Sequence, residues 1–329
     1  MFRPRVAPVA AVVAALVFQM MLLAPASAQE YPTRQIEIVV GFAPGGGADV
    51  AARLISGYAS KKWGKPVTVV NQPGASGMTA TRQVINARPD GHTLFLDVHA
   101  VSSMLFASQS DVPYRMEDKT PIALVTFDPV IYTVKADSPW KTLKEVAEAA
   151  KANPKSFRYG LGGVAAVAAF SVSQFLHAAG VPVPETNKVV FAGGAPALAA
   201  LAGGHVDFAG QQWSEAAPLI LGKKIRALAV VHPTRLPTFP DVPTAKEAGF
   251  PELNVVGWQG LSGPPKLPAN VVAKWSALLE AASKDPEFLQ QAEKVYKVIV
   301  HKGPEAFWQF QQEELKKYLP MATQIGIRK

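Results

Sequence analysis

Residues 36–54 read IEIVVGFAPGGGADVAARL, an apolar run followed by a glycine-rich loop and the beginning of a helical pattern. Ile36 and Ile38 belong to a β-branched run typical of a buried strand, while Val50 and Leu54 recur at helical spacing. The three consecutive glycines remove Cβ atoms that would keep a ligand from the backbone, and the first N–H groups of a helix lack intrahelical partners. The stretch predicts a strand, a loop that cradles a carboxylate, and a helix; the alternative is a tight turn without a ligand.

Phosphate is the competing ligand for a glycine loop of this kind. A P-loop requires Lys and Ser or Thr after its last glycine, whereas Ala48 follows here, and the dinucleotide motif requires a glycine where Val50 stands. We therefore interpret the loop as a carboxylate site. Asp49 is expected to stabilise the first helical turn, with a ligand amino group as its alternative partner. The candidate ligand contacts from this loop are Phe42, Pro44, Gly45, Gly46, Gly47, Ala48 and Asp49.

Residues 1–28 have the three parts of a secretory signal peptide. Arg3 and Arg5 precede an apolar run over residues 10–23, and Ala26-Ser27-Ala28 forms a small-residue cleavage motif. A membrane anchor is the alternative, but the run is short for a span. We expect cleavage after Ala28 and a periplasmic location. The absence of cysteine excludes disulfides, thiolate metal sites and a lipid-attachment cysteine.

Composition and charge narrow the class of protein. The net charge is +8, but the basic residues are scattered, so nucleic acid is not an expected partner. The six histidines are dispersed and no zinc-protease motif is present, so we expect neither a metal nor a cofactor. About 300 residues after the signal peptide are too many for one small core and predict two domains.

Strand and helix patterns alternate along the first part of the chain, which favours a parallel sheet. His99 follows the third predicted strand, at the edge of the sheet where ligands bind in open α/β folds. We expect it to donate a hydrogen bond to a ligand carboxylate; a surface or capping histidine is the alternative. The predicted strands cover residues 36–40, 66–70, 93–96, 121–126, 130–135, 189–191, 206–209 and 225–231, and the main predicted helices cover 75–87, 142–152, 197–202, 269–283 and 304–318.

Residues 157–176, FRYGLGGVAAVAAFSVSQFL, repeat the strand, glycine loop and helix of the opening stretch. This loop carries neither charge nor hydroxyl, so only its backbone N–H groups can bind an anion; a close-packed alanine helix is the alternative. Beyond the strand at 206–209, amides and an indole could bond to and stack on a ligand, although a tryptophan also serves plain packing. The candidates from these two segments are Gly162, Gly163, Val164, Ala165, Ala166, Gln211 and Trp213.

Four short motifs occur in the order that is typical of one known family. They are residues 41–49 (GFAPGGGAD), 71–77 (NQPGASG), 89–94 (PDGHTL) and 240–244 (PDVPT), the last followed by Glu247 and Gly249. In this order they make the chain similar to substrate-binding proteins of tripartite tricarboxylate transporters, the Bug family, over nearly all of the mature sequence. Members of that family usually have Ser or Thr in the second loop, where this chain has Leu161 and alanines. This difference from the family argues against hydroxyl contacts from the second loop. It suggests that the ligand is an aromatic or otherwise apolar carboxylate.

The resemblance implies an α/β, two-lobed periplasmic binding protein, type II-like, with a ligand cleft between two mixed or parallel-sheet lobes. Lobe 1 is expected over residues 29–130 and 232–329 and lobe 2 over 131–231, with the C-terminal helices on either lobe. The expected partners are a small organic carboxylate and the membrane subunits of a transporter, which a monomer would meet after hinge closure. The alternatives are a carboxylate sensor for a membrane receptor and a periplasmic hydrolase, but no nucleophile, base and oxyanion site assemble in the sequence.

Overall fold

The computed structural model describes residues 31–163 and 165–328, of which residues 34–328 belong to one compact unit. The predicted signal peptide, residues 1–28, and the candidate Val164 lie outside the described residues. None of the helices in the described ranges combines the length and the apolar character that crossing a bilayer requires.

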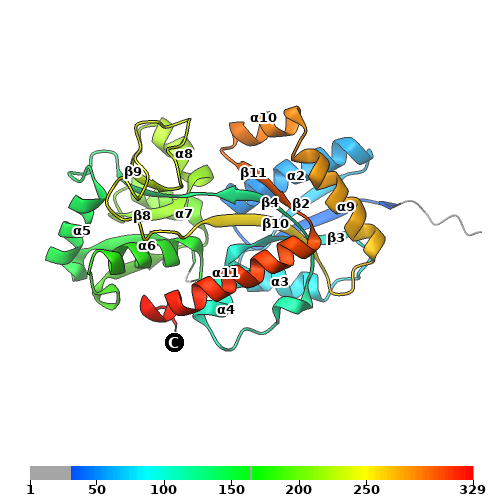
Figure 1. Cartoon of the computed structure of the whole chain (residues 1–329), viewed down its shortest axis with the longest axis horizontal. Coiled ribbons are helices and arrows are strands. Elements are labelled where there is room, and N and C mark those ends of the chain that lie inside the picture. Colours follow the sequence, from blue (N-terminus) through cyan, green and yellow to red (C-terminus); the bar gives the residue numbers. More distant parts are fainter. Residues whose placement is uncertain (1–30, 164, 329) are drawn as a thin grey trace, which may run out of the picture. The chain divides into compact units, whose positions relative to one another are not determined.

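The larger sheet has six strands in the order β11-β4-β10-β3-β1-β2 (Figure 1). Its parallel part is β1 (Ile36–Val40) between β2 (Val67–Asn71) and β3 (Thr93–Val98), as the alternating pattern predicts. The antiparallel part is β10 (Gly257–Gly263) between β3 and β4 (Thr120–Asp128), with β11 (Val298–Lys302) beyond β4. The sheet is therefore mixed, since β10 returns from a distant part of the chain.

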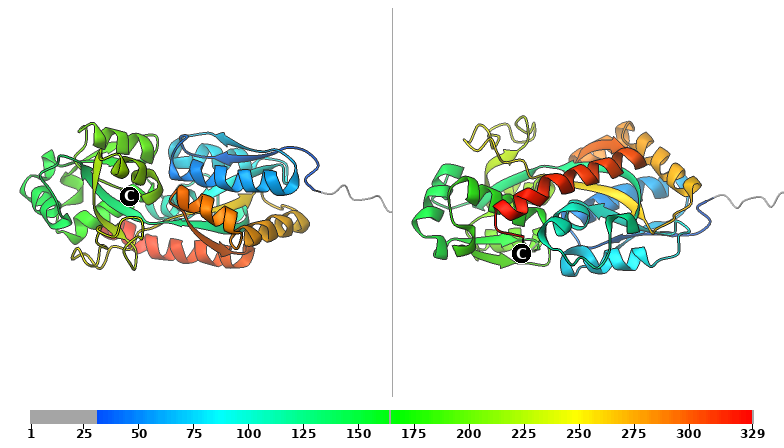
Figure 2. Two further views of the ribbon diagram at one scale, coloured as in Figure 1. Left: turned by 90° about the horizontal axis from the view of Figure 1, so that it is seen from above. Right: turned by 60° about the horizontal axis from the view of Figure 1, so that its bottom comes forward.

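Helices cover this sheet because their apolar faces have no other place to be buried. α11 packs along β4 and the short α4, as Figures 1 and 2 show, and α2 packs against β1 and β2. The helices next to this sheet are α2 (Gly47–Trp63), α3 (Met78–Ile85), α4 (Leu105–Ser108), α9 (Ala269–Ala282), α10 (Pro286–Lys294) and α11 (Pro304–Gln324), with a π-helical turn at Ala100–Met104.

A second group of strands follows directly from the first, because only Pro129 separates β4 from β5 (Val130–Lys135). β5 lies between β8 (Ala209–Gln212) and β9 (Ile225–Val231) and is antiparallel to both. The parallel pair β6 (Arg158–Leu161) and β7 (Asn187–Val190) meets this sheet through a bridge between Tyr159 and Phe208. The accompanying helices are α5 (Leu143–Ala152), α6 (Val167–Ala178), α7 (Gly194–Ala202) and α8 (Trp213–Leu221).

Three sequence predictions of local structure need correction. The helix expected over residues 75–87 is a 3-10 turn followed by the shorter α3, because Ala75 and Ser76 have positive φ angles that an α-helix cannot accommodate. The strand expected at 206–209 lies three residues later in the chain, because β8 covers Ala209–Gln212. The segment between the two predicted C-terminal helices contains α10 and β11, whose amphipathic and edge-strand patterns the prediction missed.

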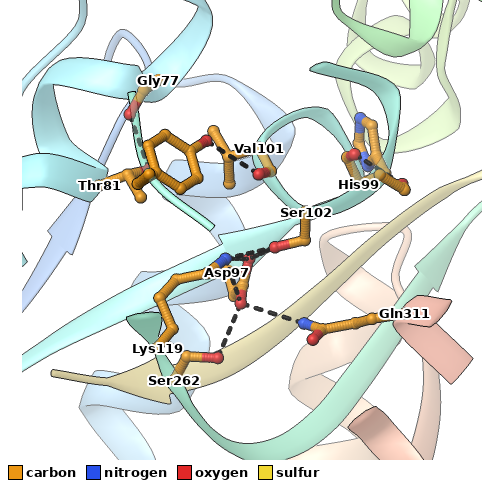
Figure 3. Close-up of polar contacts among 11 residues, drawn as sticks. Gly77, Thr81, Asp97, His99, Val101, Ser102, Lys119, Ser262 and Gln311 are labelled. Atoms are coloured by element: carbon orange, nitrogen blue, oxygen red, sulfur yellow. Dashed lines mark hydrogen bonds and ion pairs between the residues drawn. The ribbon is translucent and has the colours of Figure 1, made fainter. Parts of the chain in front are cut away.

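A buried polar network joins strands of the larger sheet to the π-helical turn and to α11 (Figure 3). The carboxylate of Asp97 on β3 accepts hydrogen bonds from Lys119 Nζ at 2.9 Å, Ser262 Oγ at 2.7 Å, Gln311 Nε2 at 3.1 Å and Ser102 Oγ at 2.5 Å. Burial lowers the pKa of Lys119, and the facing carboxylate opposes that shift. Because the pair lies in the core, removing one partner leaves an uncompensated buried charge.

We expect Lys119→Met to lower the free energy of unfolding by about 3–5 kcal/mol, since Asp97 would remain buried without its cation. Urea unfolding of the mature protein measures this loss. Lys61→Met is the matched control: Lys61 pairs with Glu287 at the exposed surface, where such pairs contribute at most about 1 kcal/mol. Equal effects of the two substitutions would contradict the structural role assigned to the buried pair.

Candidate functional site

A cavity of about 40 Å³ lies where the N-termini of α2, α6, α7 and α8 converge. One water requires roughly 10–15 Å³ of such volume, so the cavity in this conformation holds only a compact group of atoms. Its walls come from segments that are far apart in the sequence. They are Phe42, Ala43, Gly46, Gly47, Ala48, Val98, His99 and Gln259, which belong to the larger sheet and its loops, and Gly162, Ala166, Val167, Gly193, Gly194, Ala195, Pro196, Gln211, Gln212 and Glu215, which belong to the smaller sheets.

The first glycine loop contributes four of its seven candidates to the cavity wall: Phe42, Gly46, Gly47 and Ala48. Pro44, Gly45 and Asp49 lie outside the wall. Asp49 instead accepts hydrogen bonds from Gly45 N and Arg53 Nε, each at 2.9 Å, and from Asn71 Nδ2 at 3.0 Å. Burial alone would raise the pKa of Asp49, but these hydrogen bonds hold it below its usual value. Its carboxylate therefore fixes the loop around the start of α2 and has no oxygen directed at a ligand.

The second glycine loop contributes Gly162 and Ala166. Ala165 is fully buried beside Leu105 and Tyr114, and Gly163 lies against Ser76, so neither lines the cavity.

His99 lines the cavity and is buried rather than on the surface. Its Nδ1 lies 3.1 Å from the backbone N of Trp258 and 3.2 Å from the carbonyl O of the same residue. Burial lowers the pKa of His99 to about 4, an effect that the nearby Lys297 and Lys317 reinforce. The imidazole is therefore neutral at pH 7, and Nε2 is the ring nitrogen left for a ligand.

Of the two candidates beyond the predicted strand at 206–209, Gln211 and Trp213, only Gln211 lines the cavity. Trp213 is 3% exposed and packs edge-on against Phe239 and Tyr296, with ring centroids 4.6 and 5.7 Å away. The expectation that its indole stacks on a ligand is corrected: β8 continues to Gln212, so Trp213 becomes the first residue of α8 and faces the core.

The most polar part of the wall is Gln212, Glu215 and Gln259. Gln212 is one of the amides expected beyond the predicted strand at 206–209, whereas sequence reasoning missed Glu215 and Gln259. Glu215 Oε1 accepts a hydrogen bond from Gly47 N at 2.8 Å, which joins α8 to the start of α2. Burial raises the pKa of Glu215 to about 7; the Gly47 N–H and Lys297 oppose the shift and Asp128 adds to it. The other residues missed are Ala43, Val98, Val167, Gly193, Gly194, Ala195 and Pro196.

Two glycines permit this close approach between loops. A Cβ on Gly194 would lie 1.7 Å from Glu215 Oε2, and a Cβ on Gly47 would lie 2.2 Å from Gln212 Oε1. Any larger residue at either position would displace a polar side chain of the wall. The pattern Gly193-Gly194-Ala195-Pro196, which indicates the start of a helix, is the sequence signal that could have placed α7 at the site.

A second buried ion pair contacts residues of the cavity wall. Lys297 Nζ bonds to Asp128 and donates to Gln259 Oε1 at 3.1 Å. Asp128 also accepts from Ser214 N at 3.1 Å and Ser214 Oγ at 2.5 Å, and so caps the start of α8. Because the lysine can only donate, it fixes the orientation of the Gln259 amide with Nε2 as the free end.

The fold and this cavity define a two-lobed solute-binding protein of the periplasmic type. Residues 51–327 match the model of the tripartite tricarboxylate transporter family receptor, and the chain belongs to that family. The family is one of periplasmic substrate-binding proteins and not of enzymes.

Three solved structures are similar to the chain over nearly its whole length. The periplasmic binding protein BugD is 29% identical, with a TM-score of 0.85 over 91% of this chain and 99% of that one. MatC from Rhodopseudomonas palustris, solved with bound malate, is 31% identical, with a TM-score of 0.83 over 88% and 99%. R. palustris Rpa4515, solved with adipate, is 25% identical, with a TM-score of 0.87 over 90% and 99%. The Bug-family resemblance predicted from the four sequence motifs is confirmed.

The raised pKa of Glu215 predicts a pH-dependent stability. Between pH 4.5 and about 7 the unfolded chain releases this proton while the native state retains it, so stability falls as pH rises through that window. We expect the advantage of wild type over Glu215→Gln to fall by about 3 kcal/mol from pH 4.5 to 8, measured by urea unfolding.

Comparing wild type with Glu215→Gln isolates the contribution of Glu215. The lowered pKa of His99 changes stability with pH in the opposite direction, but it does so in both proteins. Glu313→Gln, at an exposed position on α11, controls for the loss of a surface carboxylate. A constant difference between wild type and Glu215→Gln across the pH range would show that Glu215 ionises normally in the native state.

Proposed function

We propose that the mature chain captures a small organic carboxylate in this cavity and delivers it to the membrane subunits of a tripartite tricarboxylate-type transporter. The observation that carries the proposal is the convergence of the α2, α6 and α7 N-termini on one cavity. Their N-cap residues are Gly46, Ala166 and Gly193, none of which has a polar side chain to cap the helix. The Glu215 carboxylate takes the Gly47 N–H of α2 and lies against Gly194 of α7, which leaves the α6 N-terminus to attract a ligand anion through its N–H groups and its dipole.

The similar structures support the same class of ligand, since one contains malate and another adipate. The wall of this cavity adds His99, whose neutral ring can donate from Nε2, and the amide of Gln211. A carboxylate held here would exchange its hydration shell for backbone and side-chain donors in a water-poor site, where charge-assisted hydrogen bonds are strong.

We propose further that the ligand has an apolar body, aromatic or aliphatic. Phe42, Val98, Val167 and Pro196 supply apolar surface on several sides of the cavity. At about 40 Å³ the present cavity suits a compact ligand, and an aromatic acid would require the two sides to move apart.

The proposed closing motion turns about the two crossings of the chain. We place lobe 1 at residues 29–130 and 232–329 and lobe 2 at 131–231, so that β4 passes into β5 at one crossing and β9 leads back at the other. Residues from both proposed lobes line the cavity, so ligand binding and closure stabilise each other. We propose that a monomer, exported after cleavage at Ala28, carries out this cycle.

A thermal-shift panel of aliphatic and aromatic mono-, di- and tricarboxylates tests the binding function. A ligand at about a hundred times its dissociation constant stabilises the native state by roughly 2.7 kcal/mol, and at least one acid should do so. Uptake of that acid by cells lacking the gene then separates a transporter receptor, whose loss abolishes uptake, from a sensor, whose loss leaves uptake intact. No shift with any acid, and no acid released from the denatured protein on mass spectrometry, would contradict the proposal.

His99→Ala should weaken binding of the acid found in this panel by about 1–3 kcal/mol, because a buried donor to the ligand is lost. Isothermal titration calorimetry measures the change. His177→Ala serves as the matched control, since His177 is exposed near the end of α6. Equal affinities for the two variants would exclude His99 from the site.

A further inference from the structure

Three of the residues that line the cavity are buried glutamines. Gln211, Gln212 and Gln259 are 1%, 4% and 0% exposed, and the Nε2 atom of each makes no hydrogen bond to any described residue. For Gln259 the direction of the amide is fixed, because its Oε1 accepts from Lys297. Buried donors without acceptors are rare in folded proteins, so a bound group with several acceptor oxygens is the expected partner.

The same cavity also contains an acceptor without a partner. Glu215 Oε2 is buried and is without a hydrogen-bond partner among the residues described, while Oε1 is occupied by Gly47 N. Above about pH 7, where Glu215 is ionised, its carboxylate oxygen only accepts, so Oε2 then requires a donor from the ligand. The Gln amides and Glu215 therefore call for different groups on one ligand.

The charges around Glu215 favour a cation as that donor. The nearest lysine, Lys297, is already paired with Asp128, so the pair adds little net charge and leaves Glu215 uncompensated. A second carboxylate placed beside Glu215 would meet like charge in a water-poor site. An ammonium group there would form a charge-assisted hydrogen bond to Oε2.

Glu215 also decides where the ligand carboxylate binds. Its Oε1 occupies the N–H of Gly47, the first residue of α2, so the protein itself supplies the anion at this helix N-terminus. The N-terminus of α6 retains backbone N–H groups behind an N-cap without a polar side chain, whereas at α7 the Glu215 carboxylate lies directly against Gly194. The Gln amides line the same cavity and can add donors to a carboxylate bound there.

We propose that the ligand is a zwitterion of the amino-acid type, with its carboxylate at the α6 N-terminus and the Gln amides, and its ammonium group on Glu215 Oε2. This inference rests on the proposed carboxylate-binding function and narrows it to acids that carry a cationic donor.

Matched pairs of acids that differ only in the amino group test the inference directly. The probes are alanine with propanoic acid, leucine with 4-methylpentanoic acid, and phenylalanine with 3-phenylpropanoic acid, each titrated calorimetrically at pH 8. For the pair that binds, we expect wild type to prefer the amino acid at least tenfold. Glu215→Gln should reduce that preference at least tenfold, because the amide cannot pair with an ammonium charge.

Gln211→Met is the control for loss of the carboxylate contacts: it should weaken both members of a pair by similar factors and leave their ratio unchanged. Urea unfolding verifies that each variant is folded, and the wild-type ratio tests the inference without any variant. If succinate, malate or a deamino acid binds as tightly as its amino counterpart, the inference is wrong while the carboxylate-binding function stands. If no acid of either kind binds, both are wrong.

Discussion

Unpaired polar groups in a buried cavity are the constraint on which this account depends. A buried donor or acceptor without a partner costs about 1–3 kcal/mol, and such groups concentrate here on Gln211, Gln212, Gln259 and Glu215. A structure that keeps several such groups in one place is destabilised there until a ligand pairs them. Ligand binding thus gains the hydrogen bonds that folding leaves unmade, which is the behaviour expected of a receptor.

Two buried ion pairs hold this arrangement in place. Lys297 and Asp128 meet where β4 passes toward β5, and through Gln259 and Ser214 they orient one wall and cap α8. Asp97 and Lys119 join β3 to the residue that precedes β4, and Asp97 lies two residues before His99 (Figure 3). Buried pairs of this kind contribute less to net stability than to a single geometry, because their desolvation offsets much of the attraction. Their role here is to hold the cavity wall in one geometry.

The sequence predicted what is local and missed what is assembled by folding. The strand, glycine loop and helix over residues 36–54 occur as predicted, because β-branched residues, consecutive glycines and helical spacing all act within one short segment. His99 was predicted as a site residue because the end of a parallel strand marks a binding edge in open α/β sheets, and it lines the cavity. Trp213 was misplaced because the end of β8 was predicted three residues too early, which altered the side that the ring faces. Gln259 had no local signal at all, since it reaches the cavity only through the antiparallel return of β10 between β3 and β4.

The crystal structure of the mature protein with its highest-affinity acid is the most direct test of this account. It should show the ligand in the cavity between α2, α6, α7 and α8, with carboxylate oxygens within about 3 Å of backbone N–H groups at the start of α6. The Nε2 atoms of the three cavity glutamines should also gain acceptors. A ligand bound elsewhere, or one in this cavity that leaves those amides unpaired, would contradict the central claim.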